Sequence, residues 1–212
     1  MQPDLILSIF TIVVLILSVI LHEVAHGFAA DKLGDPTAKL QGRLTLNPIR
    51  HIDPVGSILI PALLVLSNTG MLFGWAKPVP YNPYNLKNQR WGEAIVASAG
   101  SLTNLALALV FGLIVRFGAG ELPIPFLDLS AIICLVNLFL GVFNLIPIPP
   151  LDGFTVLRGL LPYRFSRGLH EFEERMRAGG IMTLILILFA FTYLLAGYFG
   201  SFVYSLFGLI AV

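Results

Sequence analysis

Long apolar stretches alternate with shorter polar ones along this chain. Residues 5–33, 93–117, 128–146 and 181–198 are each apolar over about 20 residues, the length that an α-helix needs to cross a bilayer. Residues 55–75 are also apolar, but proline, asparagine and glycine interrupt them, so this segment either spans the membrane or enters it and returns. The pattern therefore predicts an all-α polytopic membrane protein with about four to six membrane segments.

Other stretches depart from this pattern. In residues 37–54, leucines alternate with polar side chains around Leu44, and this period of two predicts a short β-hairpin-like stretch after the first helix. Residues 158–177 are charged and amphipathic, which indicates a helix on the membrane surface. Residues 178–212 are expected to form a C-terminal membrane segment that crosses once or twice.

The composition limits the classes of protein to which the chain can belong. Its 212 residues are 57% hydrophobic and only 12% charged, whereas soluble domains carry ~25% charged residues. The length fits one integral-membrane domain over residues 1–212, with a core at 5–161. The net charge of +1 indicates nothing about partners, and the chain contains no basic patch that would bind a nucleic acid. Cys134 is the only cysteine, so a disulfide within the chain is excluded.

Basic residues mark one side of the membrane. They gather in the two polar loops that flank residues 55–75, and cytoplasmic loops carry such an excess of lysine and arginine. Two consecutive basic loops on one side also favour a re-entrant segment between them. The basic residues are Lys32, Lys39, Arg43, Arg50, Lys77, Lys87 and Arg90.

A polar motif interrupts the first apolar stretch at His22, Glu23 and His26. Residues four apart lie on one face of a helix, so the two imidazoles can reach one ion together. Imidazole nitrogens suit Zn²⁺, and two of them with one carboxylate leave a coordination position for water. Glu23 lies on the same turn, where its carboxylate can contact that water. A charged group in the middle of a spanning helix costs ~2.5–3.5 kcal/mol, so we expect a functional reason for it.

Asp152 supplies a carboxylate at a matching depth. It follows a proline-rich break at the end of the apolar stretch 128–146. If the first helix runs towards the cytoplasm, the helix at 93–117 returns and the next one runs inward again. His26 and Asp152 then share the cytoplasmic side of the membrane. The charge count on which this topology rests is independent of the histidine motif, so the agreement strengthens the prediction of a metal site.

These motifs resemble the site-2 protease family of intramembrane zinc metalloproteases. The resemblance rests on the histidine motif at 22–26, on the run 144–153, and on Gly100 and Asn104, which are spaced four apart. It covers residues 5–161, and the chain looks like the compact members that carry no PDZ or CBS domain.

The resemblance implies a role for each matching residue. His22, His26 and Asp152 would bind one Zn²⁺ per chain. Glu23 would act as general base and general acid. Asn144 would position the substrate or help to hold the oxyanion.

The sequence therefore predicts an intramembrane zinc metalloendopeptidase in the cell membrane, with its active site towards the cytoplasm. Its partners would be a transmembrane protein substrate and the lipid bilayer. A helical substrate must unwind or pair as a strand before cleavage, so Leu44 is a candidate substrate-binding residue on a strand edge. Asn104 and His51 are further substrate-binding candidates, although His51 and Asp53 also fit a turn that caps the next segment.

Three other functions stay open at this stage. The chain could be a membrane zinc hydrolase acting on a non-peptide amide, an inactive scaffold that binds membrane helices, or a metal-ion transporter. The presence of Glu23 argues against an inactive scaffold, and the small number of carboxylates in the apolar stretches argues against a transporter.

Overall fold

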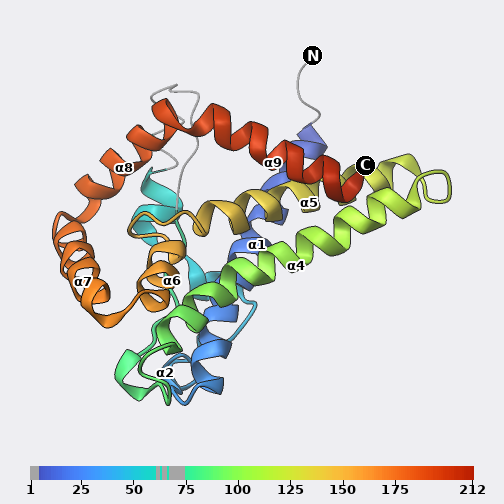
Figure 1. Ribbon diagram of the computed structural model, residues 1–212. Helices are drawn as coiled ribbons and strands as arrows, with labels where there is room; N and C mark the ends of the chain where they lie inside the picture. The colour runs from blue at the N-terminus through green and yellow to red at the C-terminus, as the bar shows by residue number, and fades with distance from the viewer. Residues whose placement is uncertain (1–4, 61–62, 64–65, 67–74) are drawn as a thin grey trace.

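The computed structural model describes residues 5–60, 63, 66 and 75–212, and every regular element within them is helical (Figure 1). The long helices are α1 Leu5–Lys32, α4 Gly92–Gly118 and α5 Ile124–Asn144. The shorter helices are α2 Thr37–Leu40, α6 Asp152–Leu160, α7 Tyr163–Ala178, α8 Gly180–Leu194 and α9 Ala196–Ala211. Single turns of 3₁₀-helix form η1 Pro48–His51 and η3 Pro83–Asn85, and a short π-helix forms η2 Pro54–Leu59.

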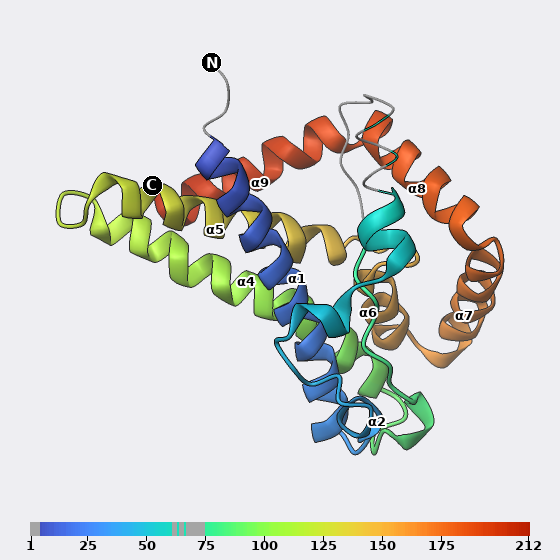
Figure 2. The same ribbon diagram turned by 180° about the vertical axis from the view of Figure 1, so that it is seen from behind.

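The helices α1, α4 and α5 form the core. α4 and α5 lie side by side, and α1 crosses them (Figures 1 and 2). α4 is central because it contacts α1, α5 and α6. Its buried positions recur every three or four residues, at Ala97, Gly100, Ser101, Asn104 and Ala108. These side chains are small, so the backbones of the neighbouring helices can approach closely.

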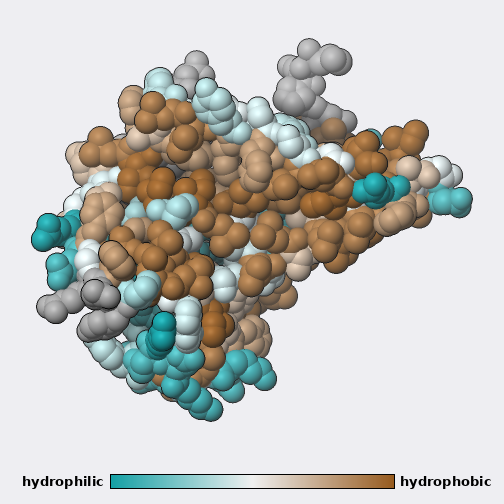
Figure 3. Space-filling view, in the orientation of Figure 1, coloured by the Kyte–Doolittle hydropathy of each residue, from teal (hydrophilic) through white to brown (hydrophobic). Residues whose placement is uncertain are grey.

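Apolar side chains also cover the outside of the long helices. Leu17 on α1, Leu102 on α4 and Phe139 on α5 are all exposed. Figure 3 shows hydrophobic side chains across most of this face, with hydrophilic ones gathered at its lower end and its tips. So large an exposed apolar surface is unusual for a soluble monomer and fits a lipid environment.

The prediction of four to six membrane segments is wrong for the described residues, where three helices, α1, α4 and α5, are long and apolar enough to cross a membrane. The apolar stretch 178–212 is divided at Leu195, where the backbone has φ −121° and ψ −20°. α8 therefore has 15 residues and α9 has 16, each shorter than the ~20 of an ordinary crossing. α9 packs against α4 and α5, and α8 contacts α7 and α9.

The prediction of a β-hairpin-like stretch is also wrong, since the described residues contain no strand. After α2 the backbone bonds locally, and the N–H of Arg43 donates to the carbonyl of Ala38 at 2.9 Å. Gly42 has a positive φ of 62°, which reverses the chain and is easily adopted by glycine. Leu44 points inward while its leucine neighbours are exposed. The leucines therefore alternate between exposed and half-buried positions because the chain turns at the surface, and they do not form a strand.

The apolar segment 55–75 lies partly outside the described residues, so its re-entrant path stays a prediction. Its described start is η2, which is capped by Asp53. The Asp53 carboxylate accepts the backbone N–H groups of Val55 and Gly56 at 3.0 and 2.7 Å. This is the capping turn that the sequence allowed at this position. The assignment of residues 1–212 to one domain also stays a prediction.

Candidate metal centre

Three potential metal ligands converge at the contact of α1, α4 and α6. His22 and His26 lie one turn apart on α1, and Asp152 is the first residue of α6. Asp152 Oδ2 lies 3.0 Å from His22 Nε2 and 3.3 Å from His26 Nε2. All three ligand atoms lie within 4.8 Å of one another.

This set of donors fits zinc. Ligand atoms that each lie ~2.0–2.2 Å from a tetrahedral Zn²⁺ are separated by roughly 3.3–3.6 Å, and the two distances from Asp152 to the imidazoles, 3.0 and 3.3 Å, are close to this. Two imidazoles and one carboxylate also form a common donor set of catalytic zinc sites. The structure thus brings together the three residues that the sequence predicted as ligands.

Each imidazole is oriented by a hydrogen bond from its other nitrogen. His22 Nδ1 lies 2.7 Å from Asn104 Oδ1, and His26 Nδ1 lies 2.7 Å from the carbonyl oxygen of Val96. Both partners are acceptors, so each Nδ1 carries a proton and each Nε2 presents its lone pair to a metal. The helix α4 therefore sets the direction of both ligands.

A buried polar chain continues behind His22. Asn104 Nδ2 donates to Asn137 Oδ1 at 2.8 Å, and Asn137 Nδ2 donates to Ser18 Oγ at 3.0 Å. Asn104 and Asn137 are fully buried. The part that Ser18 and Asn137 play in this chain of hydrogen bonds was not recognised from the sequence. The sequence did contain one signal for it, since Ser18 and His22 are spaced four residues apart and lie on one face of an apolar helix.

Gly100 allows α4 to lie directly against the two imidazoles. A Cβ at this position would lie 2.5 Å from His26 Nε2 and 2.8 Å from His22 Cδ2, closer than real Cβ atoms approach other atoms. The absence of a side chain at Gly100 is therefore required by the close packing of α4 on the metal ligands.

Electrostatics keep Asp152 ionised. Burial alone would raise its pKa, but the Nε2 groups of His22 and His26, when they carry a proton in the absence of a metal, donate to the carboxylate and lower the pKa of Asp152 to about 2. Ser101 Oγ also donates to Asp152 Oδ2 at 3.5 Å. The carboxylate is thus in the form that a metal ligand needs at neutral pH. Arg158 anchors the same helix, α6, by donating to Glu93 at the start of α4.

Glu23 is held by an extended segment, residues 75–80, which we call the strap. The backbone N–H of Val79 donates to Glu23 Oε2 at 2.8 Å. Val79 itself is buried, and it packs beside Gly27 one turn further along α1. Within the described residues Oε1 of Glu23 accepts no hydrogen bond, so this oxygen is available for proton transfer.

Several contacts hold the strap in place. Ser57 Oγ donates to the carbonyl of Trp75 at 2.8 Å, and the N–H of Lys77 donates to the carbonyl of His51 at 2.8 Å. Arg43 Nη2 donates to the carbonyls of Lys77 and Pro78 at 2.8 and 3.3 Å. These contacts were not identified from the sequence, because they join residues that lie far apart along the chain.

Asp35 anchors the chain beyond the strap. Its carboxylate is fully buried and accepts hydrogen bonds from the hydroxyl of Thr37, the N–H of Asn82 and the amide of Asn85, at 2.5, 2.6 and 2.8 Å. Burial alone would raise the pKa of Asp35, but these hydrogen bonds lower it below its ordinary value. No local signal in the sequence pointed to Asn82 and Asn85 as partners of Asp35.

The substrate-binding candidates occupy different places. Leu44 is half-buried and packs over Gly27 on α1. His51 is buried, and its Nε2 lies 2.8 Å from the carbonyl of Thr45, so in this structure it supports the loop beneath the strap. Asn104 is fully buried behind His22, and in this structure it orients that imidazole. Substrate binding by these residues stays a prediction.

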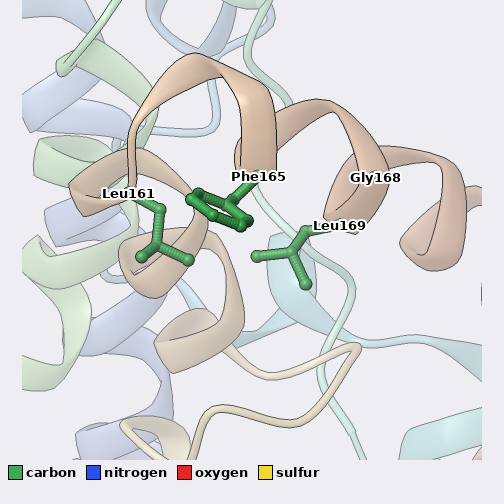
Figure 4. Close-up of a pocket in the computed structure, with 4 residues that line it drawn as sticks. All are labelled: Leu161, Phe165, Gly168 and Leu169. Atoms are coloured by element: carbon green, nitrogen blue, oxygen red, sulfur yellow. The ribbon is translucent and has the colours of Figure 1, made fainter.

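Asn144 ends α5, and its amide donates to the carbonyl of Leu140 on the same helix at 3.0 Å. Its role at the oxyanion stays a prediction. An apolar cavity of about 480 Å³ lies between the end of α6 and α7, where Leu161, Phe165 and Leu169 point towards one another (Figure 4). None of the metal ligands lines this cavity, so it is separate from the metal centre.

Comparison with known proteins agrees with this geometry. The model of peptidase family M50 matches residues 122–191, which include Asp152. The protein YwhC of Bacillus subtilis is 44% identical over 160 residues, covering 72% of this chain and 69% of YwhC. The chain belongs to peptidase family M50. The resemblance to site-2 proteases that the motifs predicted is therefore confirmed.

Other relatives extend this comparison across M50. Rip2 of Mycobacterium tuberculosis is 31% identical over 222 residues, covering 100% of this chain and 78% of Rip2. YwhC and Rip2 both carry the name "Putative zinc metalloprotease". Zinc metalloprotease MJ0392 of Methanocaldococcus jannaschii is 28% identical over 185 residues, covering 86% of this chain and 44% of MJ0392. No solved structure matches the chain.

Proposed function

We propose that this chain is an intramembrane zinc metalloendopeptidase that hydrolyses peptide bonds within or near the transmembrane segments of other membrane proteins. The observation that carries the proposal is the convergence of Asp152, at the start of α6, with His22 and His26, which lie beside Glu23 on a helix apolar enough to span a membrane. The M50 family and the names of the relatives support the same chemistry.

The metal would be one Zn²⁺ held by His22, His26 and Asp152. When bound, zinc supplies a Lewis acid that polarises a carbonyl and acidifies water. The protein contributes the orientation of this centre, because Asn104 and the carbonyl of Val96 fix the two imidazoles.

Glu23 would move the proton. Its Oε1 takes the proton from the attacking water and then delivers it to the leaving amine of the cleaved peptide. The N–H of Val79 holds Oε2 and so sets the direction of the other oxygen. The strap thus orients the catalytic carboxylate without taking part in the proton transfer.

The site would face the cytoplasm, which would also supply water. The basic residues Lys32, Lys39, Arg43 and Arg50 follow the histidines on the chain, and Lys77 lies in the strap over the same end of α1. An excess of basic residues is typical of the cytoplasmic side.

Cleavage of a transmembrane peptide by purified protein tests the proposal. The full chain in detergent would be mixed with zinc and a fluorogenic transmembrane peptide, with and without a chelator. Glu23→Gln should keep its zinc and lose cleavage by about 10²–10⁴-fold, the usual contribution of a general base. His22→Ala should lose both zinc and cleavage.

Glu121→Gln provides a control, since it makes the same chemical change at an exposed carboxylate between α4 and α5. It should cleave like the unmodified protein. Cleavage by Glu23→Gln at the rate of this control, or cleavage that persists after the zinc is removed, would contradict the mechanism. Release of a product from a non-peptide amide but not from the peptide would favour the other hydrolase.

A further inference from the structure

A second cavity, with a polar lining, lies outside the metal centre, between the turns that follow α2 and the strap. It has a volume of about 440 Å³, and the described residues that line it include basic and apolar side chains and no carboxylate. The lining residues are Gln41, Arg43, Ile49, Arg50, Ile52 and Lys77. Three cationic groups on one cavity produce a positive potential that attracts an anion.

Arg43 is the strongest sign of a ligand. Its side chain is only 7% exposed, and within the described part of the chain its Nε has no hydrogen-bond partner. Its Nη2 bonds only carbonyl oxygens, those of Lys77 and Pro78, and none of the described carboxylates pairs with it. A buried guanidinium with neutral neighbours is costly, and a bound anion would compensate its charge.

The rim of the cavity indicates the kind of anion. Ile49 and Ile52 line the cavity and are 73% and 42% exposed, so apolar side chains stand beside Arg50 and Lys77. Basic groups next to exposed apolar ones suit the level of lipid headgroups, where the apolar groups meet acyl chains and the cations meet phosphates. Arginine also binds phosphate oxygens through parallel hydrogen bonds.

We propose that this cavity binds a phosphate group, and the apolar rim favours the headgroup of an anionic phospholipid as its source. A phosphate between Arg43, Arg50 and Lys77 would tie the turn at η1 to the strap. Because the strap also holds Glu23 through Val79, the bound headgroup would stabilise the catalytic carboxylate in its present position. Only this last consequence rests on the proposed protease function.

Binding can be measured without any assay of cleavage. The full chain in nanodiscs of phosphatidylcholine with a minor fraction of phosphatidylglycerol would be examined by native mass spectrometry for retained phosphatidylglycerol. The same protein in a neutral detergent would be titrated with inorganic phosphate and followed by ³¹P NMR. Arg50→Gln and Lys77→Gln should each weaken binding by about fivefold, the usual effect of one cation near an anionic surface.

Arg90→Gln is the matched control. Arg90 is an exposed basic residue after the strap, stacked over Trp91, and it does not line the cavity. It should retain anion binding. Loss of phosphatidylglycerol binding in the two cavity variants alone supports a lipid site, and loss of inorganic phosphate binding alone supports a site for free phosphate.

Equal binding by Arg50→Gln, Lys77→Gln and Arg90→Gln would overturn the proposal, because the anion would then follow net charge and not the cavity. A protein that binds the anion selectively but cleaves no peptide would refute the proposed function and leave this site standing. A protein that cleaves peptides but binds no anion would refute this anion site and leave the proposed function standing.

Discussion

Replacement of Gly100 by alanine tests whether close packing of α4 holds the metal ligands in place. The added Cβ would lie 2.5 Å from His26 Nε2 and 2.8 Å from His22 Cδ2. Neither imidazole can turn away freely, because Asn104 and the carbonyl of Val96 hold their other nitrogens. Either α4 or the imidazoles must therefore move.

The size of that movement can be worked out from the contacts. The Cβ and Nε2 must separate by about 0.9 Å to reach 3.4 Å, where ordinary van der Waals contact begins. Metal–ligand distances tolerate changes of only about 0.2 Å. We therefore expect Gly100→Ala to weaken zinc binding by more than the 10–100-fold that loss of an outer hydrogen bond costs. The helix itself should not suffer, since alanine is favoured over glycine within a helix by ~1 kcal/mol.

The assay compares this variant with Gly112→Ala. Gly112 lies on the same helix, and its added Cβ would meet Ile210 Cγ2, a methyl group of a half-buried side chain, at the same 2.5 Å. Both variants would be dialysed against graded chelator, and their zinc content, helical circular dichroism and peptide cleavage measured. Gly112→Ala should keep its zinc. If Gly100→Ala holds zinc as tightly as Gly112→Ala, the close approach of α4 does not control the site.

Two further substitutions test the surroundings of the site. Asn104→Ala removes the acceptor that orients His22, so the affinity for zinc should fall by about 10–100-fold in a competition assay with a fluorescent chelator. An unchanged affinity would show that other contacts hold the imidazole. Asp35→Asn replaces a buried carboxylate, whose two oxygens both accept hydrogen bonds, by an amide in which an NH₂ group takes the place of one oxygen. At pH 7 the free energy of unfolding should therefore drop by about 1–3 kcal/mol. Since the pKa of Asp35 is lowered in the folded protein, the unfolded chain binds more protons in acid. The difference in stability between the unmodified protein and Asp35→Asn should therefore be complete above about pH 4 and should shrink as the pH falls through the folded-state pKa. Thermal melts of the two metal-free proteins at several pH values would measure it. A difference in melting temperature that is constant at every pH would contradict this assignment.

The sequence alone was enough to predict the three donor groups of the candidate metal centre. The spacing of His22 and His26 is a property of any helix, and an apolar stretch predicts that helix whatever surrounds it. The proline-rich break before Asp152 and the distribution of basic residues placed the third ligand at a similar depth. These patterns were sufficient because each one is read directly from the order of residues and does not depend on which helices pack together.

Where the outcome depends on distant contacts, the same local signals failed. Leucines around Leu44 alternate as in a strand, but no partner strand is present among the described residues, and the chain turns at Gly42 to place Leu44 on α1. The apolar stretch at the C-terminus is long enough to span, yet it breaks at Leu195 and α9 packs on the core. Periodicity reports which side chains are apolar and not what they pack against.

Only the tertiary structure decided how the site is supported. Asn104 is 82 residues from His22, Val79 is 56 residues from Glu23, and Asn82 is 47 residues from Asp35. The sequence does not encode such pairs locally, because a hydrogen bond between distant residues forms only after the helices have packed. The three candidate ligands could therefore be predicted from the sequence. The groups that orient them could be identified only from the structure, where α1, α4 and the strap approach one another closely.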